Sequence, residues 1–164
     1  MTYAIAGARG AIEDPEATIK QAQEWAVRHQ VEVLLADARV VFGRDHLESA
    51  VRHALRAQSA GTMIARTVSM ETLRYLSAQR QVADAIRVAG IHRGTREIAI
   101  VVFGTESFET LLDSFKWSRD DGALAAPGKS LDVLGISMEE AATVPAERRT
   151  DLALEKVALL DVVK

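Results

Sequence analysis

The chain has 164 residues, of which 48% are hydrophobic and 5% aromatic, and its formal net charge is −3. This length suffices for a hydrophobic core, so we expect one domain over residues 1–164. The lack of cysteine excludes disulfides and thiolate metal sites, and no apolar run approaches a membrane span in length. We therefore expect a cytoplasmic protein with no membrane anchor and no secretory leader.

Positive charge is concentrated in the middle of the chain. Residues 39–96 hold ten arginines and four acidic residues, a local charge of +6, and the remainder carries −9. The planar guanidinium of arginine suits phosphate groups and base stacking. Solvated helix faces rich in arginine would give the same distribution, so charge alone does not assign a nucleic-acid partner.

Local signals predict the first elements in chain order. Residues 2–6 have the composition of an edge strand, and Gly7 and Gly10 predict a turn after it. Asp14 and Pro15 are a strong helix start, and this helix should run to about residue 29 with Trp25 in the core.

The next segments predict two strands and a helix. Residues 31–36 and 39–42 have strand composition, with a bulge or turn between them. Asp45 is expected to cap an amphipathic helix that Gly61 ends. The apolar positions Leu47, Ala50, Val51, Ala54 and Leu55 should face inward, and Arg52, His53 and Arg56 outward.

The stretch from residue 69 to residue 90 has an apolar stripe that changes phase. Met70, Leu73 and Leu76 form the first half, and Val82, Ala85, Ile86 and Ala89 the second. At about 100° per residue, one continuous helix would place Val82 roughly opposite Leu73. We therefore predict a helix break at residues 77–79.

The break predicts a second helix start with free backbone N–H groups. Ser77 is expected as its N-cap and Gly90 as the glycine just past its end. Glu71, Arg74 and Tyr75 should lie on the outer side. A helix start beside Gln79, Arg80 and Gln81 favours a phosphate or a carboxylate.

The last third mixes a strand with helices. Residues 97–103 predict a central strand, and residues 105–115 a helix capped by Thr105. Residues 118–130 predict a long mobile loop, and residues 137–140 predict a capping box. A last helix should begin near Pro145, although residues 159–163 could equally be a strand. We therefore predict an α/β or α+β fold: one layered domain with a mixed or antiparallel sheet packed with several helices.

No motif predicts catalysis. Residues 126–130, APGKS, resemble the end of a phosphate-binding loop around Lys129, but the earlier glycine of that motif is one position out of place. His46 and His53 have no nearby third ligand, so they predict solvated or capping residues and not a metal site. We expect no catalytic residue, no metal and no cofactor, and a binding protein in place of an enzyme.

The pattern M-E-x-L-x-x-x-S-x-Q-x-Q-V-x-x-A-I-x-x-x-G at residues 70–90 resembles the signature of a known family. It is similar to the small tRNA-binding subunit of the KEOPS complex, whose eukaryotic relatives are called PRPK-binding protein. Residues 35–41 and 64–66 are also similar to that family, as are His46, Ala50 and residues 7–9 and 154–159. Ala78 departs from the pattern, since many relatives have glycine there, and so does Leu76 at a position where a small residue is usual.

The resemblance implies a non-catalytic, archaeal subunit of the machinery that makes threonylcarbamoyladenosine in tRNA. Such a subunit binds the kinase-like ATPase of the complex and holds the single-stranded CCA end of tRNA. The residues expected to hold the tRNA end are Arg44, His46, Arg66, Arg74, Ser77, Ala78, Gln79, Arg80 and Gln81.

The kinase-like partner is expected on an apolar patch made with the last helix. Two alternatives stay open. One is an adaptor of the ATPase that does not bind RNA, and the other is a small nucleotide hydrolase that uses Lys129.

Overall fold

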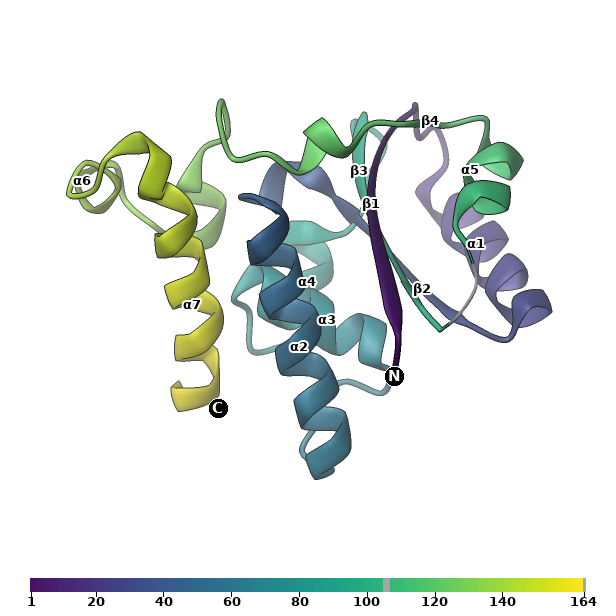
Figure 1. The fold of residues 1–164 in the computed structure, drawn as a ribbon, viewed down its shortest axis with the longest axis horizontal. Coiled ribbons are helices and arrows are strands. Elements are labelled where there is room, and N and C mark those ends of the chain that lie inside the picture. The colour runs from purple at the N-terminus through teal and green to yellow at the C-terminus, as the bar shows by residue number, and fades with distance from the viewer. Residues whose placement is uncertain (105–106, 164) are drawn as a thin grey trace. The chain divides into compact units, whose positions relative to one another are not determined.

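The computed structural model describes residues 1–104 and 107–163 (Figure 1). The helices and strands are β1 (Tyr3–Arg9), α1 (Pro15–His29), β2 (Glu32–Asp37), α2 (Arg44–Ala60), α3 (Val68–Ser77), α4 (Val82–Ala89), β3 (Glu97–Phe103), α5 (Glu109–Phe115), β4 (Ser118–Arg119), α6 (Met138–Ala141) and α7 (Arg149–Val163). Helices combined with an antiparallel sheet confirm the predicted α+β class.

The chain forms two compact units. Unit 1 comprises Met1–Ala38 and Gly90–Ala123, and unit 2 comprises Arg39–Ala89 and Leu124–Lys164. Unit 1 holds the sheet with α1 and α5, and unit 2 is helical. The single domain over residues 1–164 stays a prediction.

Unit 1 is built on a sheet with the strand order β2-β3-β1-β4, and its neighbours are antiparallel. Residues 98–103 of β3 are buried, as expected for the predicted central strand. β1 is not an edge strand, because it pairs with β3 on one side and β4 on the other. The turn predicted from Gly7 is also wrong, since Gly7 lies inside β1.

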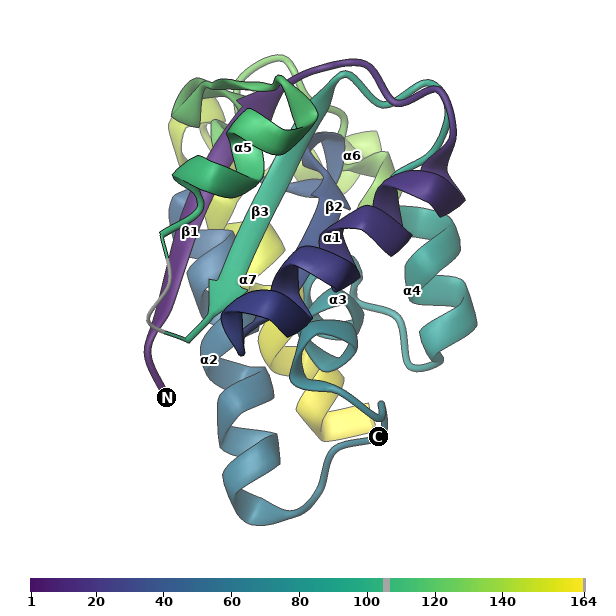
Figure 2. The ribbon, with the colours of Figure 1, turned by 90° about the vertical axis from the view of Figure 1, so that its right-hand side faces the viewer.

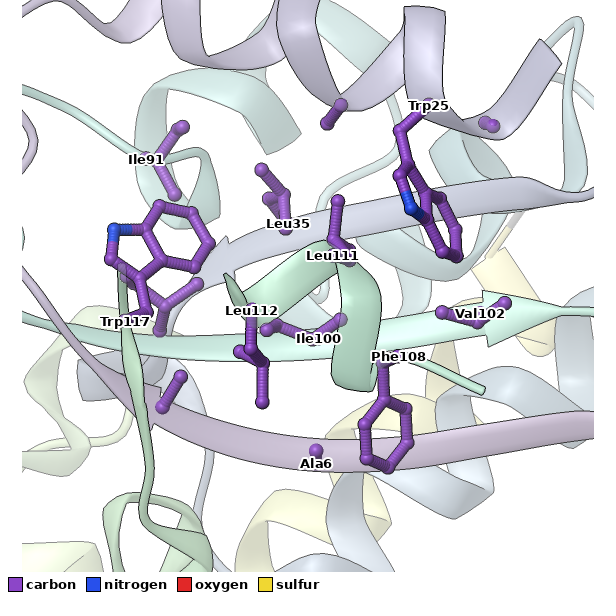
Figure 3. Packing of buried hydrophobic residues seen from close by; sticks show 14 of the residues in the cluster. Ala6, Trp25, Leu35, Ile91, Ile100, Val102, Phe108, Leu111, Leu112 and Trp117 are labelled. Atoms are coloured by element: carbon purple, nitrogen blue, oxygen red, sulfur yellow. The ribbon is translucent and has the colours of Figure 1, made fainter. Parts of the chain in front are cut away.

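Helices α1 and α5 cover one face of this sheet (Figure 2). The side chains of Trp25, Leu111 and Leu112 pack over β3, where Ile100 and Val102 point toward them (Figure 3). The Trp25 indole also donates to Thr110 Oγ1 at 3.1 Å, which satisfies its one polar group. Trp25 is therefore a core residue, as predicted.

The ends of α1 follow from local sequence. Asp14 caps the helix by accepting from the Ala17 N–H at 3.2 Å, and Pro15 takes the first turn, where no N–H is needed. Gln30 ends the helix in the left-handed conformation, with φ 56°. The predicted range was therefore correct at both ends.

Unit 2 is a set of packed helices. α2 packs against α3 and α7, and α3 packs against α4 (Figure 1). α2 begins at Arg44 after Gly43, so Asp45 lies in its first turn and is not the cap. Gly61 ends the helix at φ 70°, as predicted. A smaller apolar cluster in unit 2 contains Phe42, Leu131, Leu134, Ile136 and Ala153.

Several local predictions were wrong. Residues 39–42 do not form a strand, because Ala38–Val40 is a 3-10 turn. The segment 118–130 is not one long loop, since it contains β4 and the 3-10 turn Asp121–Leu124. The predicted cap Thr105 lies outside the described residues, and α5 begins at Glu109.

The structure also tests the predictions near the end of the chain. Residues 159–163 belong to α7 and not to a strand. The capping box at Ser137 and Glu140 is confirmed. In the described part of the chain, no helix is both long enough and apolar enough to cross a membrane.

Candidate nucleic-acid interface

The predicted helix break is present as a corner between α3 and α4. α3 ends at Ser77, Ala78 adopts φ 57° and ψ 33°, and α4 starts at Val82. The N–H groups of Ala78 and Gln79 close the end of α3 by donating to Tyr75 O at 3.2 Å and to Arg74 O at 3.0 Å. Residues 78–81, called the corner below, thus connect the two helices.

Ser77 does not cap α4. It is the last residue of α3, it is buried, and its Oγ donates to Leu73 O at 2.7 Å. The carbonyl of Gln81 accepts the first helical bond of α4, from Ala85 N at 3.0 Å. Gln81, and not Ser77, is therefore the residue directly before α4 that accepts its first bond. Gly90, directly after the helix, forms a bridge with Ala36 in unit 1.

The residues predicted on the outer side of α3 are inside. Glu71, Arg74 and Tyr75 are each at most 1% exposed. The Arg74 guanidinium donates through Nη1 to Glu71 Oε1 at 2.7 Å. A charged side chain that is buried without partners costs several kcal/mol, so this pairing explains why both are tolerated inside.

The Glu71–Arg74 pair joins two stretches of backbone. The carboxylate of Glu71 accepts from the N–H groups of Ile64 and Ala65, both at 3.1 Å. Arg74 Nε donates to the carbonyl of Arg80 at 2.7 Å. The segment before α3 and the corner after it are thus joined by a continuous chain of hydrogen bonds.

This arrangement exposes two of the predicted arginines. Arg66 follows the tethered segment, Arg80 lies in the corner, and both are exposed, as is Gln81. Ala78 and Gln79 are half-buried. No interaction with another described residue occupies the Arg66 or Arg80 guanidinium, so both are available to a ligand.

Arg44 and His46 lie in the first turn of α2. Arg44 is exposed and forms an ion pair with Glu48 at 3.5 Å. His46 is fully buried, and its Nδ1 accepts from the Phe42 N–H at 3.0 Å. The buried ring lies close to the Leu76 carbonyl, so the start of α2 and the end of α3 are neighbours.

Burial has a large effect on His46. Its pKa is lowered to about 4, mainly by desolvation; the Leu76 carbonyl acts in the opposite direction, and the nearby charge of Lys129 makes a smaller contribution to the lowering. His46 is therefore a neutral residue that fixes the start of α2. Of the two expectations, a solvated or a capping histidine, the solvated one is wrong. The buried side chain cannot reach RNA from this position.

The sequence did not reveal the cluster that holds α7. The Tyr75 hydroxyl hydrogen-bonds to the Asp161 carboxylate, and His53 Nε2 lies 3.7 Å from the same carboxylate. The Tyr75 and His53 rings lie 5.2 Å apart. A helical stripe predicted from apolar residues alone omits such a cluster, because its members are 22 and more residues apart in the sequence.

Lys129 has a structural partner. Its Nζ donates to the Val41 carbonyl at 2.6 Å, and the residues after it form the 3-10 turn Leu131–Leu134 and no long helix. The strand, loop and helix of a phosphate-binding loop are not present around it. Across residues 1–104 and 107–163, no group of three or more His, Asp or Glu side chains could hold a metal ion.

Comparison with known proteins gives one family. Residues 12–124 match the model of the family described as kinase binding protein CGI-121. The match includes α3, the corner and α4, and it ends before α7. No curated protein matches the chain.

Proposed function

Because the chain belongs to the CGI-121 family of kinase binding proteins, we propose that it is a non-catalytic subunit of the KEOPS complex. In this role it binds the kinase-like ATPase of the complex and the 3′ CCA end of tRNA during threonylcarbamoyladenosine formation. The family supports a kinase-binding accessory role, and the RNA-binding role is argued below from the corner.

The observation that carries the RNA proposal is the buried Glu71–Arg74 pair. It fixes the backbone on both sides of α3, so that Arg66 before the helix and Arg80 in the corner are exposed, with no described residue paired to either guanidinium. Proteins hold single-stranded RNA with basic grooves and with side chains that stack on bases, and arginine does both. An ordered backbone lowers the entropy lost on binding.

The proposed site therefore has two kinds of residue. Arg44, Arg66 and the corner (Ala78, Gln79, Arg80 and Gln81) contact the RNA. Arg74, Ser77 and His46 are buried, so they position these groups and do not touch RNA.

The first experiment compares intact tRNA with tRNA that lacks its CCA end. We expect the intact form to bind more tightly and the affinity to fall steeply as salt rises, since several phosphate contacts release counterions. Equal binding of the two forms would show that the end is not recognised.

The second experiment reverses one charge. Arg80→Glu should weaken binding of intact tRNA by roughly tenfold or more, because a charge-assisted contact becomes a repulsion. Arg56→Glu is the matched control, as Arg56 is also exposed in unit 2 but lies in the second half of α2. Both variants should keep kinase binding. An equal loss of tRNA binding in the two variants would refute the assignment of the corner.

We assign kinase binding to the outer face of α7. Ala158, Leu159 and Val162 follow the spacing of one helical face and are exposed, with Leu159 at 44% and Val162 at 78%. The opposite side of α7 packs against α2 and α3 (Figure 1). Exposed apolar faces of this kind are typical of protein interfaces.

The assignment of α7 is tested by Leu159→Glu. We expect it to weaken binding of the kinase-like ATPase and to leave tRNA binding unchanged. Val27→Glu, at an equally apolar and exposed position of α1, is the control. Unchanged kinase binding by Leu159→Glu would exclude this face.

Ala78 favours one alternative, an adaptor of the ATPase without RNA binding. Its left-handed conformation suits glycine, and a Cβ at this point limits the approach of a ligand to the backbone. If intact tRNA does not bind while the ATPase does, this second function is the correct one.

A further inference from the structure

A turn in unit 1 is closed by its own side chains. The N–H of Thr95 donates to His92 O at 3.0 Å, and the N–H of His92 donates to Thr95 Oγ1 at 3.0 Å. The N–H of Gly94 donates to His92 Nδ1 at 3.1 Å. Three short-range bonds thus define the conformation of residues 92–95.

The turn is also anchored to the end of β2. Asp37 is 1% exposed, and its Oδ2 accepts from Thr95 Oγ1 at 3.0 Å and lies 2.8 Å from His92 Nε2. Because His92 Nδ1 accepts a backbone N–H, the ring carries its proton on Nε2 and donates it to Asp37. Both ring nitrogens are engaged, so this pair is a structural clamp and not a free general base.

A cavity of about 410 Å³ lies beside the clamped turn. It is lined by Ala11, Ile12, Glu13, Arg93, Thr95 and Arg96. The N–H of Gly10 donates to Arg96 O at 3.0 Å, which joins the segment before α1 to the segment before β3. Both walls of the cavity are therefore fixed by backbone or buried side-chain contacts.

The charged groups that line this cavity are unpaired among the described residues. Arg93, Arg96 and Glu13 are exposed, and in the described part of the chain none of the three side chains forms an ion pair or hydrogen bond. Two other arginines of unit 1 are paired, since Arg9 lies 3.3 Å from Glu97 and Arg119 lies 3.1 Å from Asp121. Two unpaired guanidinium groups on a rigid turn are suited to a phosphate group.

The volume and the remaining lining residues indicate more than a phosphate ion. A cavity of this size accommodates a small organic ligand. Ala11 supplies an exposed apolar surface for a planar ring, whereas the Ile12 side chain is only 2% exposed and belongs to the core. The Glu13 carboxylate accepts from N–H donors. Adjacent ring and amino N–H groups, as on the Watson–Crick edge of guanine, match a carboxylate better than the edge of adenine does.

We propose that this cavity binds a guanine nucleotide. Arg93 and Arg96 hold its phosphate, Ala11 contacts the base, and Glu13 accepts from the base N–H groups. The same chemistry is offered by free guanosine monophosphate and by an unpaired guanosine in RNA. The proposal goes beyond tRNA-end binding and does not depend on it, because the residues belong to unit 1 and the corner to unit 2.

The test is a titration of the full chain followed by backbone amide NMR. Guanosine monophosphate should shift the amides of residues 11–13 and 93–96, adenosine monophosphate should shift them less, and inorganic phosphate should affect mainly 93–96. No shifts at these residues with millimolar guanosine monophosphate would overturn the proposal. Equal effects of all three compounds would do so as well, since the base would then contribute nothing.

Variants separate the proposed contacts. Arg93→Ala and Arg96→Ala should each weaken the nucleotide by roughly tenfold, the usual effect of losing a charged hydrogen bond. Glu13→Gln should reduce the preference for guanine over adenine while phosphate binding stays the same. Lys20→Glu is the control, as Lys20 is an exposed cation on α1 that does not line the cavity. A loss with Lys20→Glu equal to that with Arg93→Ala would overturn the site.

A last arm distinguishes the two sources. Two single-stranded RNAs, one containing guanine and one containing only adenine, are tested as competitors of guanosine monophosphate. Competition by the guanine-containing RNA alone supports the site and identifies RNA as the source. Binding of the free nucleotide without such competition supports the site and identifies the free nucleotide. The Arg80→Glu variant should behave as the wild type here, so failure of the corner proposal would be recognised separately.

Discussion

The buried imidazole of His46 makes the stability of the protein depend on pH. In an unfolded chain a histidine has a pKa of about 6.5, and in the folded protein that of His46 is about 4. Between about pH 6.5 and about pH 4, the unfolded state therefore binds more protons than the folded state does. The free energy of unfolding must decrease as the pH falls over this range and be unaffected by His46 at higher pH.

The size of this effect follows from the two pKa values. Relative to neutral pH, His46 should reduce the free energy of unfolding by about 1.4 kcal/mol at about pH 5.5 and by about 2.5 kcal/mol at about pH 4.5. Protonation of Nδ1 would also remove the acceptor of the Phe42 N–H. The start of α2 should then be the first helix end to lose order.

The assay is urea unfolding followed by circular dichroism, for the wild type and for His46→Asn. Asparagine can accept the same backbone N–H but does not titrate, and every other ionisable group is shared. The variant is therefore expected to be less stable at neutral pH and to lose less stability on acidification. Equal losses for the two proteins between about pH 7.5 and pH 5.5 would refute the reasoning, as would an NMR titration of His46 near its unperturbed pKa.

Three further predictions concern stability. Ala78→Gly should raise the free energy of unfolding in urea by up to about 1 kcal/mol, because glycine adopts the left-handed conformation without cost, and a decrease would contradict this. Arg74→Met should lower it by about 3 kcal/mol, since the carboxylate of Glu71 would stay buried without its cation; an unchanged urea midpoint would argue against the pair. Gly10→Ala would place a methyl group 2.1 Å from Trp117 Cδ1 and should lower the thermal midpoint by several degrees, and an unaltered midpoint would mean that the indole moves freely.

The elements predicted correctly are those determined by neighbouring residues. The ends of α1 depend on Asp14, Pro15 and the chain immediately after them, and the capping box at Ser137 is equally local. The corner was found because a change of phase in an apolar stripe is also a local property. Such signals do not require knowledge of the rest of the fold.

The errors arose where distant partners decide the outcome. Helical periodicity assigns Glu71 and Arg74 to the solvent side because both are charged. Their burial depends on the N–H of Ala65 and the carbonyl of Arg80, which no periodic pattern identifies. The strand predicted at residues 39–42 was wrong for a related reason. Val41 is buried without belonging to a strand, and strand-like composition reflects burial as much as strand pairing.

The same distinction applies to the candidate site. The exposed positions of Arg66 and Arg80 were consistent with the sequence, but the pair that fixes their backbone was not predicted. The clamp of His92 and Thr95 on Asp37 was missed entirely, because both residues lie 55 or more positions after Asp37 in the chain. Sequence therefore indicated which groups could bind, and structure showed which groups support them.

The pairing of β1 with β3 has a consequence for how the protein folds during synthesis. β1 ends at Arg9, yet β3, with which it pairs, begins only at Glu97. β2 pairs with β3 as well, so neither early strand can form these pairs until β3 has been synthesised. A ribosome must therefore deliver the whole of residues 39–89 before the sheet can form. Until then β1 and β2 present unpaired edges, which makes incomplete chains prone to aggregation and folding dependent on contacts distant in sequence.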